Sequence, residues 1–359
     1  GFTALYITPL RSLNRDMMNR LEWWGKELGI RIAVRHGDTT QNDRRKQATH
    51  PPDLLITTPE SIQAMFMGKV LRKHLAGVRY VIVDEIHELA ASKRGCQLSV
   101  ALERIDELAG NFQRIGISAT VGNPELVGQF LCGKRPCQVV AVPVAKTLDL
   151  SVRFAGEGFG EQVKMIEKCI DSHTSTLVFT NTRSVAEAIG NAFSAREDID
   201  VHHGSLSREV RVDAEDRFRN GLTRGMICTS SMELGIDIGQ IDHVVQFNSP
   251  REVARLMQRT GRAGHRIGAA SKGMILATGF DDILESMVVV RLATDNRPEN
   301  VRPHMNPADV IANQIAALAV ERGEISIENI ELIFSRCYCF ENAGELIRDV
   351  IAQMEKHYL

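Results

Sequence analysis

Two acidic residues and a set of arginines are the side chains of this sequence best suited to phosphate chemistry. The apolar segment Val81–Val83 ends directly at Asp84 and Glu85, and His87 follows two residues later. Adjacent carboxylates can divide the work of phosphoryl transfer, because one can hold Mg²⁺ while the other orients and deprotonates water. Far downstream, residues 258–266 read QRTGRAGHR, and such arginines can stabilise phosphate charge. Together these segments predict an ATP-hydrolysing site that uses Mg²⁺.

A phosphate-binding loop of the Gly-x-x-x-x-Gly-Lys-Ser/Thr type is absent from the 359 residues. The Gly-Lys pairs at 25–26, 68–69 and 133–134 are followed by Glu, Val and Arg, so none of them qualifies. The sequence also starts without Met and enters an apolar strand pattern at once. We therefore expect the chain to be a fragment that begins just after its phosphate loop.

Length and charge limit the possible architecture and partners. The 359 residues suit two domains of about 150 residues each with a smaller appendage. The formal net charge of −2 argues against a polycation, so nucleic-acid contacts would come from local grooves and backbone amides. No apolar run is long enough for a membrane span, and no targeting signal is visible. We expect no membrane contact and a cytoplasmic location, near the nucleoid if the cell is bacterial or archaeal.

The seven cysteines are odd in number and lack paired Cys-x-x-Cys spacing. Cys132 with Cys137, and Cys337 with Cys339, have no matching His or Cys pair at the spacing of a zinc site. We expect reduced thiols with packing roles.

Short apolar runs alternate with longer segments of helical spacing along most of the chain. This alternation predicts an α/β fold with parallel sheets covered by helices on both faces. The expected strands are Leu5–Ile7, Leu54–Ile56, Tyr80–Val83, Ile115–Ile117, Leu177–Phe179, Met226–Cys228, Val244–Phe247 and Met274–Leu276. Ligands of such sheets bind at the carboxyl ends of the strands. The polar residues expected at those ends are Thr8, Thr57, Asp84, Ser118, Thr180 and Thr229.

An internal repeat relates the two halves of the chain. Leu5–Leu13 matches Leu177–Val185 and Leu54–Thr58 matches Met226–Ser230, both at an offset of 172, and His36–Asp38 matches His203–Ser205 at an offset of 167. Threonine, serine and glycine residues that follow strands often have no role beyond building turns and capping helices. Three ordered matches at strand ends instead favour a shared surface for a phosphodiester backbone, which needs many contacts independent of base sequence.

The order of the motifs resembles that of superfamily 2 DNA/RNA helicases of the DEAD/DEAH type, and among them the large helicase-related (Lhr) proteins. The resemblance rests on Thr8–Leu13, Thr57–Ser61, Asp84–His87, Ser118–Thr120, Val178–Arg183, His203–Ser205, Thr229–Asp237 and Gln258–Arg266. It implies two tandem RecA-like parallel-sheet domains, followed by a small helical domain that resembles part of a winged helix. The expected boundaries are 1–145, 146–298 and 299–359.

The resemblance assigns separate roles to the residues after the acidic strand. Asp84 would position Mg²⁺ on the β- and γ-phosphates, and Glu85 would orient and deprotonate the attacking water, so both belong to the metal and nucleotide site. An acidic turn exposed to solvent is the plainer alternative. His87 would couple hydrolysis to movement. Its expected partners in this coupling are Ser118, Thr120 and Gln258.

In the downstream segment, the resemblance implies that Arg262 and Arg266 act on the γ-phosphate as arginine fingers. The position that usually holds the final arginine is His265 here, and an arginine follows it. Arg259 could pair locally or touch the adenine side. The residues expected to shape the nucleotide side of the second domain are Gly235 and Asp237.

The same resemblance places a row of residues on the backbone of single-stranded or partly duplex DNA or RNA. These residues are Thr8, Arg11, Thr57, Thr58, Thr180, Arg183, His203, Gly204 and Thr229. Such contacts carry little base information, so no sequence specificity is predicted. Trp23 and Trp24 lie in a helical stretch, and we expect core packing or a domain contact rather than base stacking.

The favoured function is an ATP-dependent helicase or translocase, which the resemblance suggests moves 3′ to 5′ on DNA in repair or recombination. The alternative is a nucleic-acid-binding or regulatory protein that keeps the helicase shape without turnover. Intact Asp84, Glu85 and Arg262 favour hydrolysis. A restriction-type or chromatin-remodelling translocase is disfavoured by the repeat spacing and the helical tail. The oligomeric state is left open by the sequence.

Overall fold

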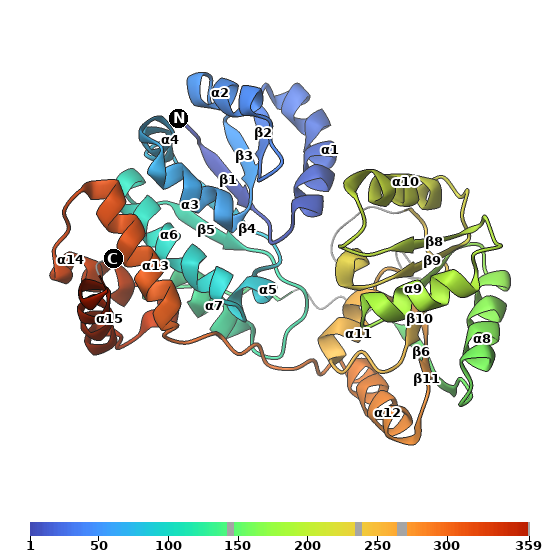
Figure 1. Cartoon of the computed structure of the whole chain (residues 1–359). Coiled ribbons are helices and arrows are strands. Elements are labelled where there is room, and N and C mark those ends of the chain that lie inside the picture. The colour runs from blue at the N-terminus through green and yellow to red at the C-terminus, as the bar shows by residue number, and fades with distance from the viewer. Residues whose placement is uncertain (142–146, 234–238, 264–270, 358–359) are drawn as a thin grey trace. The chain divides into compact units, whose positions relative to one another are not determined.

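The computed structural model describes residues 1–141, 147–233, 239–263 and 271–357. These residues form two compact units. Unit 1 consists of residues 1–140 and 300–359, and unit 2 consists of residues 141–299. Each unit is built on a parallel sheet flanked by helices (Figure 1). The expected α/β fold of two tandem parallel-sheet domains is therefore confirmed.

Unit 1 carries a five-stranded parallel sheet in the order β2-β3-β1-β4-β5. Its central strands are short apolar runs because helices cover both faces of the sheet. The strands are β1 Ala4–Ile7, β2 Ile32–Arg35, β3 Leu54–Thr57, β4 Tyr80–Val83 and β5 Gln113–Gly116. The helices are α1 Arg11–Leu28, α2 Gln41–Thr49, α3 Pro59–Met67, α4 Lys69–Leu75, α5 Ile86–Ala90, α6 Lys93–Ala109 and α7 Pro124–Cys132.

Unit 2 carries a six-stranded parallel sheet in the order β6-β11-β10-β7-β9-β8. The strands are β6 Leu148–Phe154, β7 Thr176–Phe179, β8 Ile199–His202, β9 Gly225–Cys228, β10 His243–Phe247 and β11 Ser271–Ala277. The helices are α8 Phe159–Asp171, α9 Arg183–Ala192, α10 Arg208–Arg219, the short η1 Ser230–Met232, α11 Val253–Thr260 and α12 Phe280–Thr294. Strands β7, β9 and β10 are buried along their whole lengths, as expected for the centre of such a sheet.

The strands that the sequence pattern missed all lie at sheet edges. β2, β6 and β8 were not expected, and β5 begins and ends earlier than the expected run Ile115–Ile117. An edge strand is only partly covered, so its sequence need not be a continuous apolar run. β6, for example, alternates half-buried and exposed residues at most of its positions. The central strands of both sheets lie where the sequence predicts them.

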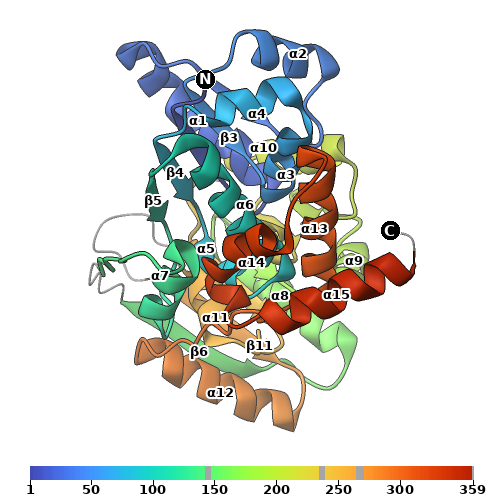
Figure 2. The same ribbon diagram turned by 90° about the vertical axis from the view of Figure 1, so that its left-hand side faces the viewer.

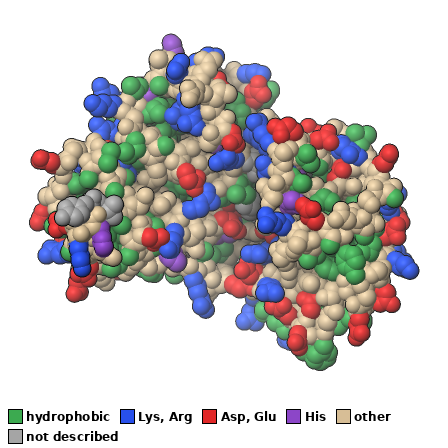
Figure 3. Space-filling view, viewed as in Figure 1, with side chains coloured by type: hydrophobic (Ala, Val, Ile, Leu, Met, Phe, Trp, Pro, Cys, Tyr) green, Lys and Arg blue, Asp and Glu red, His purple; other side chains and the backbone are tan. Residues whose placement is uncertain are grey.

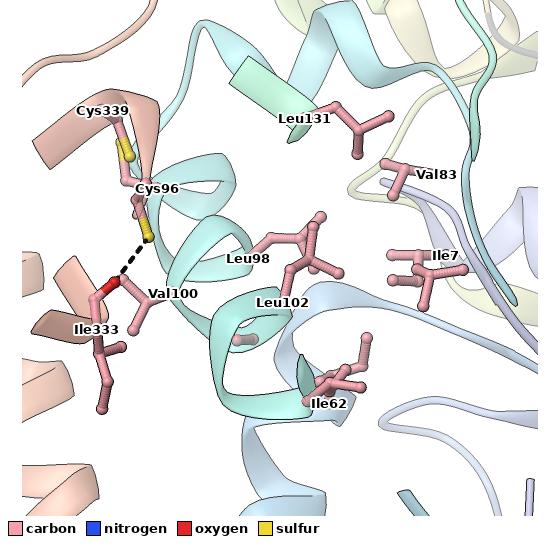
Figure 4. Packing of buried hydrophobic residues seen from close by; sticks show 14 of the residues in the cluster. Ile7, Ile62, Val83, Cys96, Leu98, Val100, Leu102, Leu131, Ile333 and Cys339 are labelled. Atoms are coloured by element: carbon pink, nitrogen blue, oxygen red, sulfur yellow. Dashed lines mark hydrogen bonds between the residues drawn. The ribbon is translucent and has the colours of Figure 1, made fainter. Parts of the chain in front are cut away.

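The C-terminal helices share one core with the sheet of unit 1. They are α13 Ala308–Arg322, α14 Ile327–Ser335, η2 Tyr338–Phe340 and α15 Gly344–Lys356. α13 and α14 pack on α6, and α15 packs on both of them, as Figure 2 shows from the side of these helices. Helix α6 is therefore buried on two faces. Leu98 and Leu102 point toward the sheet, whereas Cys96 and Val100 point toward the C-terminal helices (Figure 4).

A buried ion pair also joins α6 to α13. The side chain of Arg104 is 1% exposed, and it forms an ion pair with Glu321 and hydrogen bonds with Gln63 and Gln314, each at 3.3 Å. Its guanidinium lies 3.8 Å from the ring centroid of Phe66. A charge removed from water needs such partners, because desolvation would otherwise disfavour the folded state. The pair fixes where α13 lies on α6.

Two further properties of the described residues concern thiols and membranes. All seven cysteines are free, and only Cys137 is exposed. Burial raises the pKa of the Cys337 thiol to about 12, which keeps it protonated and unreactive.

No helix in the described part of the chain is both long and apolar enough to cross a membrane.

We expect Glu321→Ala to lower the free energy of unfolding of unit 1 by about 3–5 kcal/mol, because it leaves Arg104 buried without its counter-ion. Urea-induced unfolding followed by circular dichroism measures the change. Glu324→Ala, at an exposed glutamate just beyond the same helix, is the matched control and should be nearly neutral. An equal effect of the two substitutions would show that the Arg104 pair does not tie α13 to α6.

Glycine is required at Gly95, where α6 starts close to the end of α5. A Cβ atom there would lie 2.0 Å from the carbonyl oxygen of Leu89, a backbone atom that side-chain rotation cannot move away. Gly95→Ala should therefore destabilise unit 1 by about 2 kcal/mol or more. Gly160→Ala in α8 is the matched control, because nothing lies within 4 Å of its Cβ position. Denaturant unfolding should show the control unchanged or up to about 1 kcal/mol more stable.

Candidate nucleotide and nucleic-acid sites

The acidic pair lies at the carboxyl end of β4, near the middle of the unit 1 sheet. The backbone N–H of Asp84 donates to the carbonyl of Ile7 at 2.8 Å, which extends the ladder between β4 and β1. Tyr6 donates its hydroxyl to Oδ2 of Asp84 at 2.9 Å, and the Glu85 N–H donates to Oδ1 at 3.0 Å. Burial and the Asp84 carboxylate raise the pKa of Tyr6, so this phenol keeps its proton. Both oxygens of Asp84 are thus oriented.

Glu85 adopts a left-handed backbone conformation, with φ of 48°. Such a conformation is unfavourable for a residue with a Cβ atom, and strain of this kind concentrates at functional sites. It makes the sharp turn by which the chain leaves β4 and enters α5. The Glu85 side chain is 20% exposed, so its carboxylate stays within reach of water.

His87 is held close to its expected coupling partner Ser118. The ring Nδ1 lies 3.2 Å from the Ser118 hydroxyl and 3.6 Å from Glu85 Oε2. Burial lowers the pKa of His87 to about 4, so the ring is neutral near pH 7 and can accept as well as donate hydrogen bonds. Thr120 is exposed two residues beyond Ser118. Gln258 lies on α11 of unit 2.

The residues at the end of β4 have the chemistry that Mg²⁺ requires. This ion prefers oxygen ligands and is usually bound through one or two carboxylates together with substrate phosphates. Asp84 and Glu85 offer carboxylate oxygens at one strand end. In the ranges that the structure describes, no group of three or more His, Cys, Asp or Glu side chains could hold a metal by itself. The donor set fits an ion shared with a nucleotide rather than a site made of protein ligands alone.

In unit 2, Arg259 and Arg262 of the downstream segment have different environments. Arg259 is 1% exposed, forms an ion pair with Glu233, and donates from Nη1 to Asn181 at 3.3 Å and to Gln246. Of the two roles considered for it, local pairing is the one observed. Arg262 is partly exposed and donates from Nε to the carbonyl of Glu233 at 3.0 Å. Arg266, Gly235 and Asp237 lie outside the described residues.

The repeat is visible in the hydrogen bonds of the two strand ends. The Thr8 hydroxyl donates to the carbonyl of Leu10 at 2.8 Å, and the equivalent Thr180 hydroxyl donates to the carbonyl of Thr182 at 3.0 Å. Both threonines are fully buried. Thr57 is also buried and donates to the Arg35 carbonyl at 2.8 Å. These three hydroxyls therefore shape the turns, as in the plainer interpretation, and their side chains do not face solvent.

Each unit also has an exposed arginine at the start of the helix that follows its repeat strand. In unit 1, Arg11 contacts Asp38 in the His36–Asp38 turn. In unit 2, Arg183 contacts Ser205 in the His203–Ser205 turn. We call these two sets the unit 1 corner (Arg11, His36, Gly37, Asp38) and the unit 2 corner (Arg183, His203, Gly204, Ser205). The exposed members are the arginines, the glycines, Asp38 and Ser205.

The other expected nucleic-acid residues have mixed exposure. Thr58 is buried at the N-terminus of α3, and Thr229 is half-buried just before η1. His203 is 3% exposed and its Nε2 pairs with Glu187 at 2.7 Å, so its imidazole faces its own unit. Trp23 and Trp24 are 58% and 54% exposed, so the expected core packing of these rings is wrong.

Sequence reasoning missed several residues that position these strand ends. Arg94 on α6 donates to the Pro9 carbonyl at 2.8 Å and to Glu60 at 2.6 Å, which links the turns after β1 and β3. Arg44 donates to the carbonyls of His36, Gly37 and Thr39. For Arg44 a signal existed, because the repeat offset of 167 matches it to Arg211. Arg94 has no such signal, since its partners are distant in the sequence.

Comparison with known proteins identifies both units. Residues 1–127 match the family model described as DEAD/DEAH box helicase, and residues 161–268 match the one described as helicase conserved C-terminal domain. The ATP-dependent helicase Lhr-Core of Methanothermobacter thermautotrophicus is 38% identical over 371 residues, which cover 94% of this chain and 43% of that protein. The Lhr helicase/uracil glycosylase of Escherichia coli is 37% identical, with 88% of this chain and 25% of that protein covered.

The solved structure of Mycobacterium smegmatis helicase Lhr bound to ssDNA and AMP-PNP matches the fold with a TM-score of 0.86 and 36% identity. The match covers 97% of this chain and 50% of that chain. The chain thus spans half or less of the length of the relatives named here. With two RecA-like parallel-sheet units, both helicase domains and Lhr proteins among its similar relatives, the chain belongs to the Lhr-like helicases of superfamily 2.

Proposed function

We propose that this chain is the motor portion of an ATP-dependent helicase or translocase that acts on nucleic acid. The observation that carries the proposal is the pair Asp84 and Glu85, held at the end of β4 in a strained turn beside a neutral His87. A module that only binds nucleic acid has no chemical need for this arrangement. The names of the Lhr relatives, which are ATP-dependent helicases, support the same activity.

In this proposal, Asp84 would hold Mg²⁺, which would supply positive charge to stabilise the phosphates of the nucleotide. Glu85 orients the attacking water and accepts its proton. Tyr6 fixes one oxygen of Asp84 and leaves the remaining lone pairs for the ion and its water ligands. Arg262 stabilises the charge of the transferring phosphate, and the equivalent role of Arg266 remains part of the proposal.

Because His87 is neutral, it exchanges hydrogen bonds rather than charge. The Ser118 hydroxyl and the Glu85 carboxylate both lie next to Nδ1 of the imidazole. A shift of the Glu85 carboxylate on hydrolysis would therefore alter the bond to Ser118, two residues beyond the end of β5. We assign His87 and Ser118 to the coupling between hydrolysis and movement on this basis, and we add Thr120 and Gln258 because the resemblance implies them.

The nucleotide phosphates lie, in the same proposal, at the carboxyl ends of β4 and β5. The strand β5 is at the edge of the described unit 1 sheet and pairs there with β4 alone. Its carboxyl end lies beside the acidic pair, since the N–H of Ile117 donates to the Val83 carbonyl at 2.9 Å. These carboxyl ends are where ligands of parallel sheets bind.

For nucleic acid we propose a single strand bound through its backbone, with DNA as the substrate. The solved Lhr relative is described as bound to ssDNA. Lys, Arg, Asp and Glu side chains are interspersed on the surface in view, so local contacts rather than a broad basic patch must hold the strand (Figure 3). The contacts come from Arg11, Arg183, Gly204 and Thr229, while the buried Thr8, Thr57, Thr58, Thr180 and His203 shape the turns.

The finer parts of the proposal are movement from 3′ to 5′, a role in DNA repair or recombination, and a cytoplasmic location. The resemblance to Lhr proteins supports the direction and the role. The relative from Escherichia coli is named both a helicase and a uracil glycosylase, which also favours a repair setting.

Hydrolysis of ATP tests the central claim. We expect turnover stimulated by single-stranded DNA in a version of the chain extended upstream through a phosphate loop, and little turnover from this chain alone. Glu85→Gln should lower the stimulated rate about 100-fold or more, because the base for the attacking water is lost. Glu125→Gln, at an exposed glutamate on α7, is the control and should leave the rate unchanged. An extended protein that binds DNA and stays inert would indicate the non-hydrolysing alternative.

Alanine substitutions of the two downstream arginines should change different properties, one the catalytic rate and the other the stability of unit 2. Arg262→Ala should lower kcat about 100- to 1,000-fold and change thermal unfolding much less than Arg259→Ala does, because a partly exposed donor to the phosphate is lost. Arg259→Ala should destabilise unit 2 by about 3–5 kcal/mol, because Glu233 stays buried without its counter-ion. Steady-state kinetics and unfolding curves of both variants separate the effects. A stable Arg259→Ala protein with the larger loss of kcat would reverse the assignment.

A further inference from the structure

We propose that the two corners bind the nucleic-acid backbone unequally, because Asp38 holds the arginine of the unit 1 corner while Ser205 leaves the arginine of the unit 2 corner available for phosphate. The inference rests on the proposed nucleic-acid binding and adds a regulation of that same surface. Asp38 and Ser205 are the residues that set the difference.

The corners are structural equivalents, which makes the comparison between them meaningful. The ring Nδ1 of His36 accepts from the N–H of Asp38 at 3.1 Å, and Nδ1 of His203 accepts from the N–H of Ser205 at 3.3 Å. The helix after each turn is capped at equivalent positions, by the hydroxyls of Thr40 and Ser207. The same backbone frame thus presents two different side chains to its arginine.

The arginine contacts differ in charge. Nη1 of Arg11 lies 2.8 Å from Oδ1 of Asp38, and both side chains are well exposed. Nη1 of Arg183 lies 3.0 Å from the neutral hydroxyl of Ser205. A phosphate that approaches Arg11 must displace a carboxylate and then lie beside its negative charge. A phosphate that approaches Arg183 displaces only a hydroxyl, which can itself donate to a phosphate oxygen.

Unit 2 has a carboxylate near its corner as well, but its position is different. Glu187, one helical turn after Arg183, pairs with Nε2 of His203 at 2.7 Å. The equivalent position in unit 1 is Arg15, at the repeat offset of 172. The acidic group of unit 2 therefore holds the imidazole that supports the turn, whereas the acidic group of unit 1 holds the phosphate-binding arginine.

The glycines show the same difference in space. A Cβ atom on Gly37 would lie 2.8 Å from Nη2 of Arg11, so the guanidinium lies against the turn. A Cβ atom on Gly204 would meet nothing within 4 Å. Arg44 donates to the carbonyls of His36 and Gly37 at 3.1 and 3.0 Å, whereas no such bond of the matching Arg211 occurs among the described residues. The turn of the unit 1 corner is thus packed against Arg11 and bonded to Arg44, whereas the turn of the unit 2 corner leaves space around Gly204.

A difference in affinity between the two corners suits a motor that moves along a strand. Such a motor needs one binding site that releases the strand while the other keeps it bound. An exposed ion pair contributes only a small free energy, so Asp38 weakens the unit 1 grip without abolishing it. A phosphate can then displace Asp38 from Arg11 while other contacts hold the strand on unit 1. When those contacts weaken, Asp38 pairs with Arg11 again and the phosphate is released.

Binding of a fluorescein-labelled oligothymidylate, measured by anisotropy over a range of salt concentrations, tests the inference. Asp38→Ser should tighten binding about two- to fivefold, and Ser205→Asp should weaken it by a similar factor. In the unaltered protein, Arg183→Gln should weaken binding more than Arg11→Gln does. In the Asp38→Ser background, the two arginine substitutions should weaken it equally. Ser194→Asp, at an exposed serine two residues beyond the C-terminus of α9, is the charge-matched control and should have little effect.

The outcomes separate this inference from the proposed function. If Asp38→Ser tightens binding as much in the Arg11→Gln background, the effect is one of general charge and the inference is overturned. It is also overturned if the unaltered protein loses equal affinity with either arginine substitution. If the unaltered protein binds no oligothymidylate even at low salt, the nucleic-acid part of the proposed function fails with it. Matching unfolding curves for all variants exclude a loss of fold.

Discussion

A parallel sheet with helices on both faces must bury both sides of every central strand, and this constraint decides where polar chemistry can occur in the molecule. β1, β4, β7 and β9 consist almost wholly of apolar or buried residues. Their first available polar positions are at the carboxyl ends, where the chain turns toward the next helix. The acidic pair and the arginines of both corners follow such ends, whereas the His-Gly turns of the corners follow the edge strands β2 and β8. The strained backbone of Glu85 follows from the same constraint, since β4 has to turn into α5 within two residues.

Burial separates the charged residues that stabilise the fold from those that can contact a ligand. Arg104 with Glu321 and Arg259 with Glu233 are removed from water and ion-paired, so they fix the position of helices. Arg262 lies three residues beyond Arg259 and is partly exposed, and its Nε and Nη2 donate to the backbone carbonyl of Glu233. The buried arginine thus anchors α11 and thereby places the exposed one. A motif rich in arginine contains both kinds, and burial distinguishes them.

The internal repeat shows how one frame can present different chemistry. Backbone and capping bonds are kept in both units, down to the histidine that accepts from the N–H two residues later. One side chain that faces solvent at the same position of the two corners is not kept. An aspartate contacts the arginine in unit 1 and a serine does so in unit 2. Duplicated units can therefore share a fold and a ligand class and still bind the ligand with unequal strength.

The sequence by itself determined the fold class, the central strands, the repeat and the residues at strand ends, because burial on both faces leaves continuous apolar runs and a fixed place for polar groups. It did not determine the edge strands β2, β6 and β8, which are partly covered and so lack that signal. Only the tertiary structure decided that Thr8, Thr57 and Thr180 turn their hydroxyls inward, and that Trp23 is exposed. It alone also paired Arg259 with Glu233. The physical reason is that exposure and pairing depend on neighbours brought together from distant parts of the chain, and the spacing of residues along the sequence does not contain that information.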